Sequence, residues 1–223
     1  MELRTYPDRE MMFMELADEL ASELGNCLRT HEHASFCVPG GTTPGPIFDV
    51  LCDVALDWGR VHVFLNDERW VPETSERSNT RLLRERLLTG KAAKAKLVPM
   101  VSDTPEPEDA LDSLAAGFAG EFPISVLLLG MGSDMHTASL FPGADRLGEA
   151  LAANAPTLMA MRAPGALEPR VTLTAHVLDG AMSKHVVITG AEKREAVERA
   201  RHLSREEAPI TAVWNGAVVH WAE

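Results

Sequence analysis

Apolar and polar positions alternate along this chain with two different spacings. The clearest continuous apolar run, residues 124–129, is typical of a strand that is buried on both faces of a sheet. Other segments, such as residues 7–31, place apolar residues three or four positions apart, as on one face of a helix. Because the two kinds of segment follow one another repeatedly, the sequence predicts a Rossmann-like α/β fold, with a mainly parallel sheet and helices on both faces.

These patterns assign the expected elements along the chain. Helices are expected at residues 7–31, 46–56, 79–88, 109–122 and 192–203, the third of them capped by Asn79. Strands are expected at residues 35–38, 60–65, 96–101, 124–129, 157–161, 170–174, 185–189, 210–213 and 218–221. Residues 66–78 are expected to form a polar loop, and the irregular stretch 145–170 a small insertion or subdomain over the sheet. We expect residues 1–223 to form a single domain.

Composition narrows the range of ligands and compartments. With 21 Lys and Arg against 33 Asp and Glu, the formal net charge is −12, which disfavours nucleic acid and membranes as partners. The three cysteines form no CxxC pair, and the first residues lack the basic and apolar regions of a signal peptide. We therefore expect a cytoplasmic protein. The sequence leaves the oligomeric state open and is compatible with a monomer.

Four short groups of glycine, hydroxyl or charged residues follow predicted strands, where open α/β sheets bind their ligands. The first is PGGTTP at residues 39–44. Its glycines would let the backbone approach an anion closely, and its threonines add hydroxyl donors. The alternative is a plain turn with a helix cap. The segment matches neither GxGxxG nor GxxxxGK[ST], so it supports neither a dinucleotide site nor a Walker-type nucleotide site.

The second and fourth groups contain cations. In NDERWVP at residues 66–72, Arg69 could bind a phosphate bidentately, while Asp67 and Glu68 either hold it in place or take part in acid–base chemistry. In GAEK at residues 190–193, Lys193 opposes the dipole at a helix N-terminus, which hints at a bound anion. The alternatives are a solvated charged loop and a surface lysine.

The third group follows the apolar run 124–129 and contains a single histidine. Gly130 and Gly132 interrupt the strand, and His136 stands two residues after Asp134. A lone histidine is more often a packing or surface residue, but a position at the carboxyl end of a buried strand favours chemistry.

Other residues offer weaker signals. His31 and His33 resemble a metal-binding pair, but no third ligand is apparent in the sequence, so no metal site is predicted there. The chain contains no GxSxG segment, so a serine hydrolase triad is unsupported.

Taken in this order, the four groups resemble the 6-phosphogluconolactonases of the short bacterial type, within the glucosamine/galactosamine-6-phosphate isomerase superfamily. The resemblance rests on PGGTTP, on NDERWVP with the following Ser78 and Asn79, and above all on GMGSDMHTASLFPG at residues 130–143. PRVTLT at residues 169–174 and GAEK extend it over nearly the whole chain.

The resemblance implies an α/β fold shared with sugar-phosphate isomerases and glucosamine-6-phosphate deaminases. It also implies hydrolysis of 6-phospho-D-glucono-1,5-lactone to 6-phospho-D-gluconate in the oxidative pentose phosphate pathway. The ligand would be a small phosphorylated sugar lactone, and neither a metal nor an organic cofactor is expected.

The resemblance also implies roles for individual residues. His136 would be the general base that activates water, and Asp134 would orient or tune it. Positive charge for the phosphate would come from Arg170 and Lys193. Asp67 is a further possible site residue, and whether Asp134, Asp67 or water is the partner of His136 stays open. The substrate oxygens would be cradled by Gly40, Gly41, Thr42 and Thr43, together with Arg69.

One departure and two alternatives accompany this interpretation. The family usually has glycine directly before the histidine, whereas this chain has Met135, and a glycine there would permit a positive φ. A glucosamine-6-phosphate deaminase would need a glutamate five residues after the histidine, where this chain has Phe141. A non-catalytic sugar-phosphate sensor would keep the anion cradle and lose the base, and the retained His136 argues against it.

Overall fold

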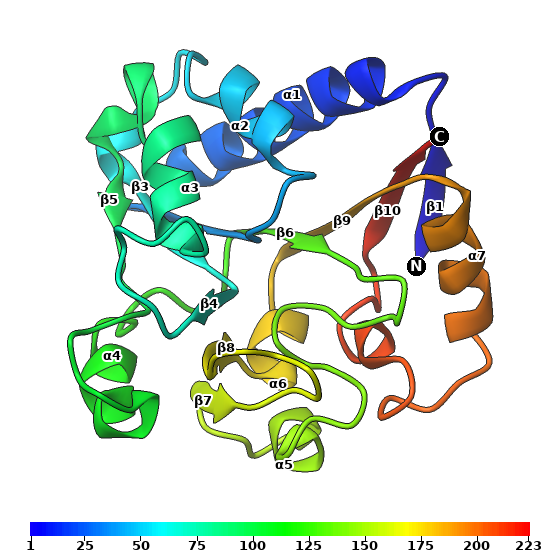
Figure 1. Ribbon diagram of the computed structural model, residues 1–223. Helices are drawn as coiled ribbons and strands as arrows, with labels where there is room; N and C mark the ends of the chain where they lie inside the picture. The colour runs from blue at the N-terminus through cyan, green and yellow to red at the C-terminus, as the bar shows by residue number, and fades with distance from the viewer.

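The computed structural model describes residues 1–223 and is built around a seven-stranded parallel sheet (Figure 1). Its strands are β1 (Glu2–Thr5), β2 (Ala34–Val38), β3 (Val61–Leu65), β5 (Lys96–Leu97), β6 (Val126–Gly130), β9 (Ser183–Thr189) and β10 (Val218–Ala222). They lie in the order β1-β10-β9-β6-β2-β3-β5, and all neighbouring pairs are parallel. The central strands β2 and β6 are buried, as the continuous apolar runs predict.

The winding of the chain changes direction between β2 and β6. From β2 the chain adds β3 and β5 on one side, whereas from β6 it adds β9 and β10 on the other. Connections that leave in opposite directions open a crevice at the carboxyl ends of the two strands, where α/β proteins bind ligands. The PGGTTP segment follows β2 and the histidine-containing loop follows β6, so both border this crevice.

Helices lie on both sides of the large sheet. The α-helices are α1 (Arg9–Leu28), α2 (Gly45–Leu51), α3 (Asn79–Arg86), α4 (Leu111–Ala116), α5 (Leu147–Leu151), α6 (Ala175–Asp179) and α7 (Ala191–Ala200). Short 3-10 helices are η1 (Trp58–Arg60), η2 (Gly90–Lys94), η3 (Pro107–Asp109) and η4 (Pro209–Ala212). In Figure 1, α1 and α2 lie above the sheet, whereas α5 and α6 lie below it. None of the helices is long and apolar enough to cross a membrane.

Helix α1 shows how the pattern of the sequence positions an element. Asp8 caps its N-terminus by accepting a hydrogen bond from the Met11 N–H. Its buried side chains recur three or four positions apart, as Met12, Leu16, Leu20 and Leu24. This face packs against α2, β2, β6 and β10, so the helix spans the middle of the sheet.

A second, antiparallel sheet forms the expected small subdomain. It consists of β4 (Asp67–Arg69), β7 (Leu158–Met161) and β8 (Arg170–Leu173), in the order β4-β8-β7. The register of β4 and β8 pairs Arg69 with Arg170. Two segments that are far apart in the sequence therefore meet beside the crevice.

The α/β fold with a parallel sheet and a small subdomain is confirmed, but several local predictions are wrong. Residues 66–78 contain β4 instead of being a continuous loop. Residues 210–213 lie largely in the 3-10 helix η4, because their apolar character reflects burial and not an extended backbone. Ser78, not Asn79, caps α3 by accepting from the Arg81 N–H. Helix α4 ends at Ala116, well short of residue 122, because Gly117 and Gly120 follow it.

Candidate active site

A cavity of about 270 Å³ opens at the carboxyl ends of the parallel strands, at the change of winding direction. It is lined from the loops after β2, β3 and β6 and from β4, β8, α3 and α7. Nine of the ten residues predicted from the sequence line it: Gly40, Gly41, Thr42, Thr43, Asp67, Arg69, His136, Arg170 and Lys193. The tenth, Asp134, does not line the cavity but contacts His136.

The loop after β6 folds tightly around His136. The Gly132 N–H donates to the His136 carbonyl at 3.0 Å, and the Met135 N–H donates to the Gly132 carbonyl at 2.9 Å. A Cβ atom on Gly132 would lie 2.2 Å from His136 Nδ1, so only glycine fits there. Met135 has a φ of 66°, the left-handed conformation that the family glycine would suit. Its carbonyl accepts from the Ile210 N–H, which helps to hold this conformation.

The imidazole of His136 is oriented by a carboxylate and an aromatic ring. Nδ1 lies 2.5 Å from Asp134 Oδ1, and the ring stacks on Phe141 with centroids 4.1 Å apart. Because a carboxylate accepts at Nδ1, the proton belongs on Nδ1 and the lone pair on Nε2. Partial burial acts to raise the pKa of Asp134, but the hydrogen bonds and charge of His136 outweigh it and leave that pKa below its usual value.

Two guanidinium groups lie next to each other on the wall formed by the small sheet. Arg69 and Arg170 are partners across β4 and β8, and the Nε of each is buried without a hydrogen-bond acceptor. Burial lowers the pKa of Arg170, and repulsion from Arg69 adds to this, while Asp67 at 3.6 Å opposes it. The carboxylate of Glu168 lies 3.6 Å from Arg69 Nε, beyond hydrogen-bond distance. Buried guanidinium donors that lack a close acceptor are suited to bind an anion.

Lys193 adds a cation from a different element. It lies in the first turn of α7, after Gly190, whose φ is 85°. Burial lowers the pKa of its ammonium, although Glu192 and Asp134 act in the opposite direction. The cavity therefore has positive charge on the wall from β4 and β8 and on the side of α7.

The PGGTTP segment supplies backbone donors. Gly41 has a φ of 84°, and a Cβ on Gly40 would lie about 2.1 Å from the Asn79 side chain, so both glycines are required by the geometry. The amides of residues 40–43 donate no hydrogen bond within the protein. Four neighbouring N–H groups at a cavity wall are thus available to oxygens of a ligand.

Glu68 is a positioning residue whose role sequence reasoning left undecided. Its side chain is buried and accepts hydrogen bonds from the backbone N–H groups of Arg69, Asn79 and Thr80 and from the hydroxyls of Ser78 and Thr80. Burial raises its pKa, although these donors act to lower it. Of the two roles considered from the sequence, the contacts support holding Arg69 in place.

Two asparagines of the cavity were missed as site residues. Asn79 accepts from Arg69 Nη1 at 3.0 Å and donates to the Asp67 carbonyl at 3.1 Å. Asn66 leaves its Oδ1 buried without a donor. Both belong to groups already singled out, but only the packing of β4 against α3 shows that they face the cavity.

Comparison with known proteins gives a consistent result. The family described as glucosamine-6-phosphate isomerases/6-phosphogluconolactonase matches residues 7–221. A 6-phosphogluconolactonase of Rhizobium meliloti is 39% identical over 215 residues, which cover 93% of this chain and 92% of that protein. A crystal structure of a 6-phosphogluconolactonase from Shewanella baltica has a TM-score of 0.95 at 30% identity, with 100% of this chain and 97% of that chain covered.

Proposed function

The chain belongs to the glucosamine-6-phosphate isomerase/6-phosphogluconolactonase family, and from this membership we propose that it hydrolyses 6-phospho-D-glucono-1,5-lactone to 6-phospho-D-gluconate. The observation that carries the proposal is the pairing of His136 with Asp134 at a cavity that also holds Arg69 and Arg170. A base beside a concentration of positive charge suits an anionic, hydrolysable substrate. The proposal includes action in the cytoplasm, within the oxidative pentose phosphate pathway, by one domain of residues 1–223.

The proposed reaction begins with the lone pair on Nε2 of His136. A water molecule attacks the lactone carbonyl carbon and gives one of its protons to Nε2. Meanwhile the imidazole keeps its own proton on Nδ1, where it faces Asp134. The C–O bond of the ring then breaks, and the departing ring oxygen takes the proton back from Nε2. The acid released loses its proton to solvent, so the histidine returns to its starting state. General-base catalysis of this kind contributes about 10²- to 10⁴-fold.

The remaining groups bind and orient the substrate. Arg69, Arg170 and Lys193 surround the cavity with charge that complements a phosphate. The amides and hydroxyls of residues 40–43 would bind substrate oxygens, including the oxyanion that forms as water attacks. Binding energy from the phosphate would thus position the lactone carbonyl against the attacking water.

The position of Phe141 separates this proposal from a deaminase. The ring of Phe141 stacks on His136, and the Arg170 guanidinium lies 5.1 Å from its centroid. A deaminase of this superfamily would need a carboxylate there to transfer protons, and a phenyl ring has no such group. The aromatic ring instead packs against one face of the imidazole, and it also contacts the Arg170 guanidinium in a cation–π interaction.

The experiment that tests the proposal follows acid release from freshly prepared 6-phosphogluconolactone, with spontaneous hydrolysis as the baseline. We expect the protein to accelerate release well above this baseline. Absence of acceleration, with 6-phosphogluconate still bound, would favour the non-catalytic sensor instead.

A further inference from the structure

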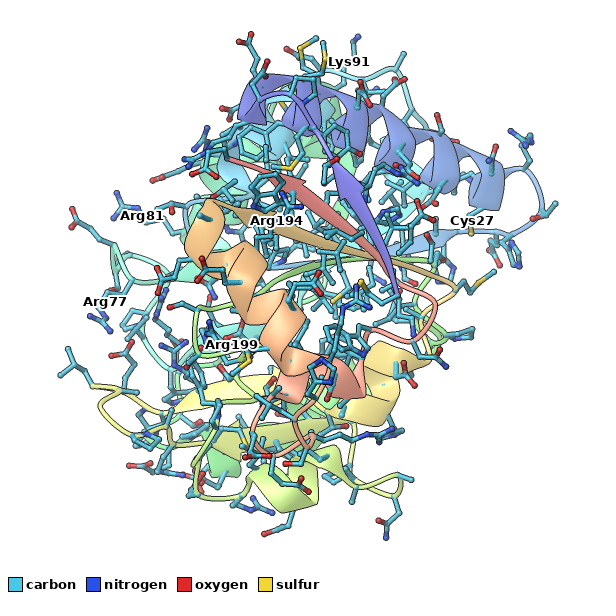
Figure 2. The ribbon with its side chains drawn as sticks, turned by 90° about the vertical axis from the view of Figure 1, so that its right-hand side faces the viewer. Cys27, Arg77, Arg81, Lys91, Arg194 and Arg199 are labelled. Atoms are coloured by element: carbon cyan, nitrogen blue, oxygen red, sulfur yellow. The ribbon has the colours of Figure 1, made fainter.

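Three side chains with metal-ligating atoms meet at the opposite end of the large sheet. His33 directly precedes β2, His62 is the second residue of β3, and Glu121 lies in the turn before β6. All three are therefore at the amino ends of parallel strands, whereas the active-site cavity is at the carboxyl ends. In Figure 2, Cys27, whose sulfur lies 4.0 Å from the His33 carbonyl, is on the side of the molecule opposite to Arg77, whose carbonyl contacts Arg69.

The carboxylate of Glu121 faces both imidazoles. His62 Nδ1 lies 2.8 Å from Oε1, and His33 Nε2 lies 3.6 Å from Oε2. The two rings stack with centroids 4.2 Å apart and an interplanar angle of 15°. One ligand atom from each residue lies within 4.8 Å of the other two. Three ligand atoms thus converge on one small region.

Hydrogen bonding inside the protein leaves Glu121 incompletely satisfied. Its side chain is only 3% exposed, and its buried Oε2 has no hydrogen-bond partner. A buried carboxylate oxygen without a donor costs stability unless a cation or donor compensates it. No lysine or arginine contacts it, and the lactone hydrolysis proposed above makes no use of it.

We propose that His33, His62 and Glu121 bind a divalent transition-metal ion of the zinc class. Two imidazoles and one carboxylate are a ligand set that zinc prefers, and magnesium or calcium would take oxygen ligands alone. His33 is 31% exposed, so solvent reaches the cluster and water can fill a fourth position. The ion would join β2, β3 and the turn before β6, and it would also satisfy Glu121 Oε2.

The ligand distances allow this with a small adjustment. A tetrahedral ion with bonds of about 2.0–2.1 Å keeps its ligand atoms roughly 3.4 Å apart. The present atoms are within 4.8 Å of one another, so they must approach by about 1.4 Å at most. The stacked rings must also turn, so that the in-plane lone pair of each points to the ion. The partly exposed His33 has the most freedom to move.

A second cluster of two histidines and one glutamate lies in the core and differs from the proposed metal site in its hydrogen bonding. Glu19, His185 and His220 also bring ligand atoms within the same distance. There, however, every imidazole nitrogen already has a partner: Tyr6, the other imidazole, Glu23 or Ser183. A metal would have to displace partners that are not themselves ligands, whereas at the proposed site the bonded pair, His62 and Glu121, consists of two ligands. The second cluster is therefore a hydrogen-bond network and not a metal site.

The test is a Co²⁺ titration of the metal-free protein, followed by the visible absorption of the bound ion. We expect one Co²⁺ per chain with the strong absorption of a tetrahedral site, its displacement by Zn²⁺, and a higher melting temperature with Zn²⁺. His33→Asn should weaken binding at least about 100-fold, because loss of a second-shell partner alone costs 10- to 100-fold. His31→Asn is the matched control, since this exposed neighbour lies outside the cluster.

Variants of the other ligands and of the active site test the same assignment. Glu121→Gln should also abolish Co²⁺ binding, and if that variant fails to fold, the result for His33→Asn decides. Lactone hydrolysis should be unchanged in His33→Asn, because the cluster is remote from the cavity. Absence of Co²⁺ binding, equal weakening in His31→Asn, or binding that is lost in His136→Ala and kept in His33→Asn would each overturn the proposal.

Discussion

The histidines of the cavity and of the core differ in how their ring nitrogens are used. In the cavity, His136 engages Asp134 through Nδ1 only. In the core, the Tyr6 hydroxyl lies 2.7 Å from His220 Nδ1, His220 Nε2 lies 2.9 Å from His185 Nδ1, and His185 Nε2 lies 2.9 Å from Glu23 Oε2. One choice of tautomers satisfies every nitrogen of this core network.

The difference separates a binding site from a structural network. In the same cavity, the Nε atoms of Arg69 and Arg170 are buried without a hydrogen-bond acceptor, although carboxylates lie 3.6 Å from each guanidinium group. A bound anion can therefore add hydrogen bonds that the protein alone does not supply. The core network leaves nothing for a ligand to satisfy, and burial, with repulsion from His185 and Arg4, lowers the pKa of His220 to about 3. We infer that unsatisfied polar atoms, more than the presence of a histidine, mark the site of chemistry.

The largest expected effect is on turnover. His136→Ala should lower kcat by about 10²- to 10⁴-fold, or roughly 3–5 kcal/mol of barrier, because the general base is lost. The dissociation constant of 6-phosphogluconate should change little, since the cations and amides remain. His202→Ala, at an exposed histidine, is the control for both measurements. Unchanged turnover in His136→Ala would rule out the role of the base.

The next effect concerns the core network and pH. Folding holds the pKa of His220 at about 3, below its unfolded value of 6.5, so protonation favours the unfolded state. The contribution of neutral His220 to the free energy of unfolding is fully present above pH 6.5. It is lost as the pH falls towards 3, at about 1.4 kcal/mol per pH unit.

Urea unfolding between pH 7 and pH 5 measures this dependence. His220→Asn should have a shallower loss of unfolding free energy than the wild type, because it no longer takes up this proton on unfolding. His202→Asn should keep the slope of the wild type. Equal slopes for wild type and His220→Asn would show that His220 does not carry the dependence.

A smaller effect is expected on substrate affinity. Arg69→Ala should weaken binding of the phosphorylated lactone by about 10- to 100-fold, since hydrogen bonds to charged groups contribute about 1.5–3 kcal/mol. Binding of the dephosphorylated lactone should fall much less. Arg81→Ala is the matched control, because this arginine pairs with Glu85 outside the cavity and projects from the surface in Figure 2. Equal losses with both lactones would contradict a role for Arg69 in phosphate binding.

The smallest effect concerns the strained position before His136. With φ at 66°, Met135→Gly should be more stable than Met135→Ala by about 1 kcal/mol, because a left-handed residue with a Cβ costs about 1–2 kcal/mol. Both variants remove the methionine side chain, so the comparison isolates the backbone. Thermal unfolding measures it, and greater stability of the alanine variant, the usual order in helices and strands, would show that no such strain exists.

The sequence predicted the parallel sheet and most of the cavity because both depend on local signals. The run 124–129 predicts a buried strand, and the groups at strand ends meet at one edge of any parallel sheet. Pairing of β4 with β8 has no such signal, so the contact between Arg69 and Arg170 could not be predicted. β1 was missed because this short edge strand lacks a buried, alternating pattern.

The candidate metal ligands at the amino ends of the strands could not be predicted for the same reason, because they come from segments that are far apart in the sequence. His33 was weighed with His31, its neighbour in sequence, and no third ligand was found. In the fold His33 instead meets His62 and Glu121, which come from the next strand and from a distant turn. Spacing along the chain predicts ligand sets only where one loop or helix supplies them.

The most direct test of the contrast between the two groups of histidines is an NMR titration of the imidazole nitrogens with 6-phosphogluconate. We expect saturable shifts of the ring resonances of His136, while those of His185 and His220 stay unchanged. Saturable shifts at His185 or His220 with none at His136, or binding that leaves all three unchanged, would contradict it.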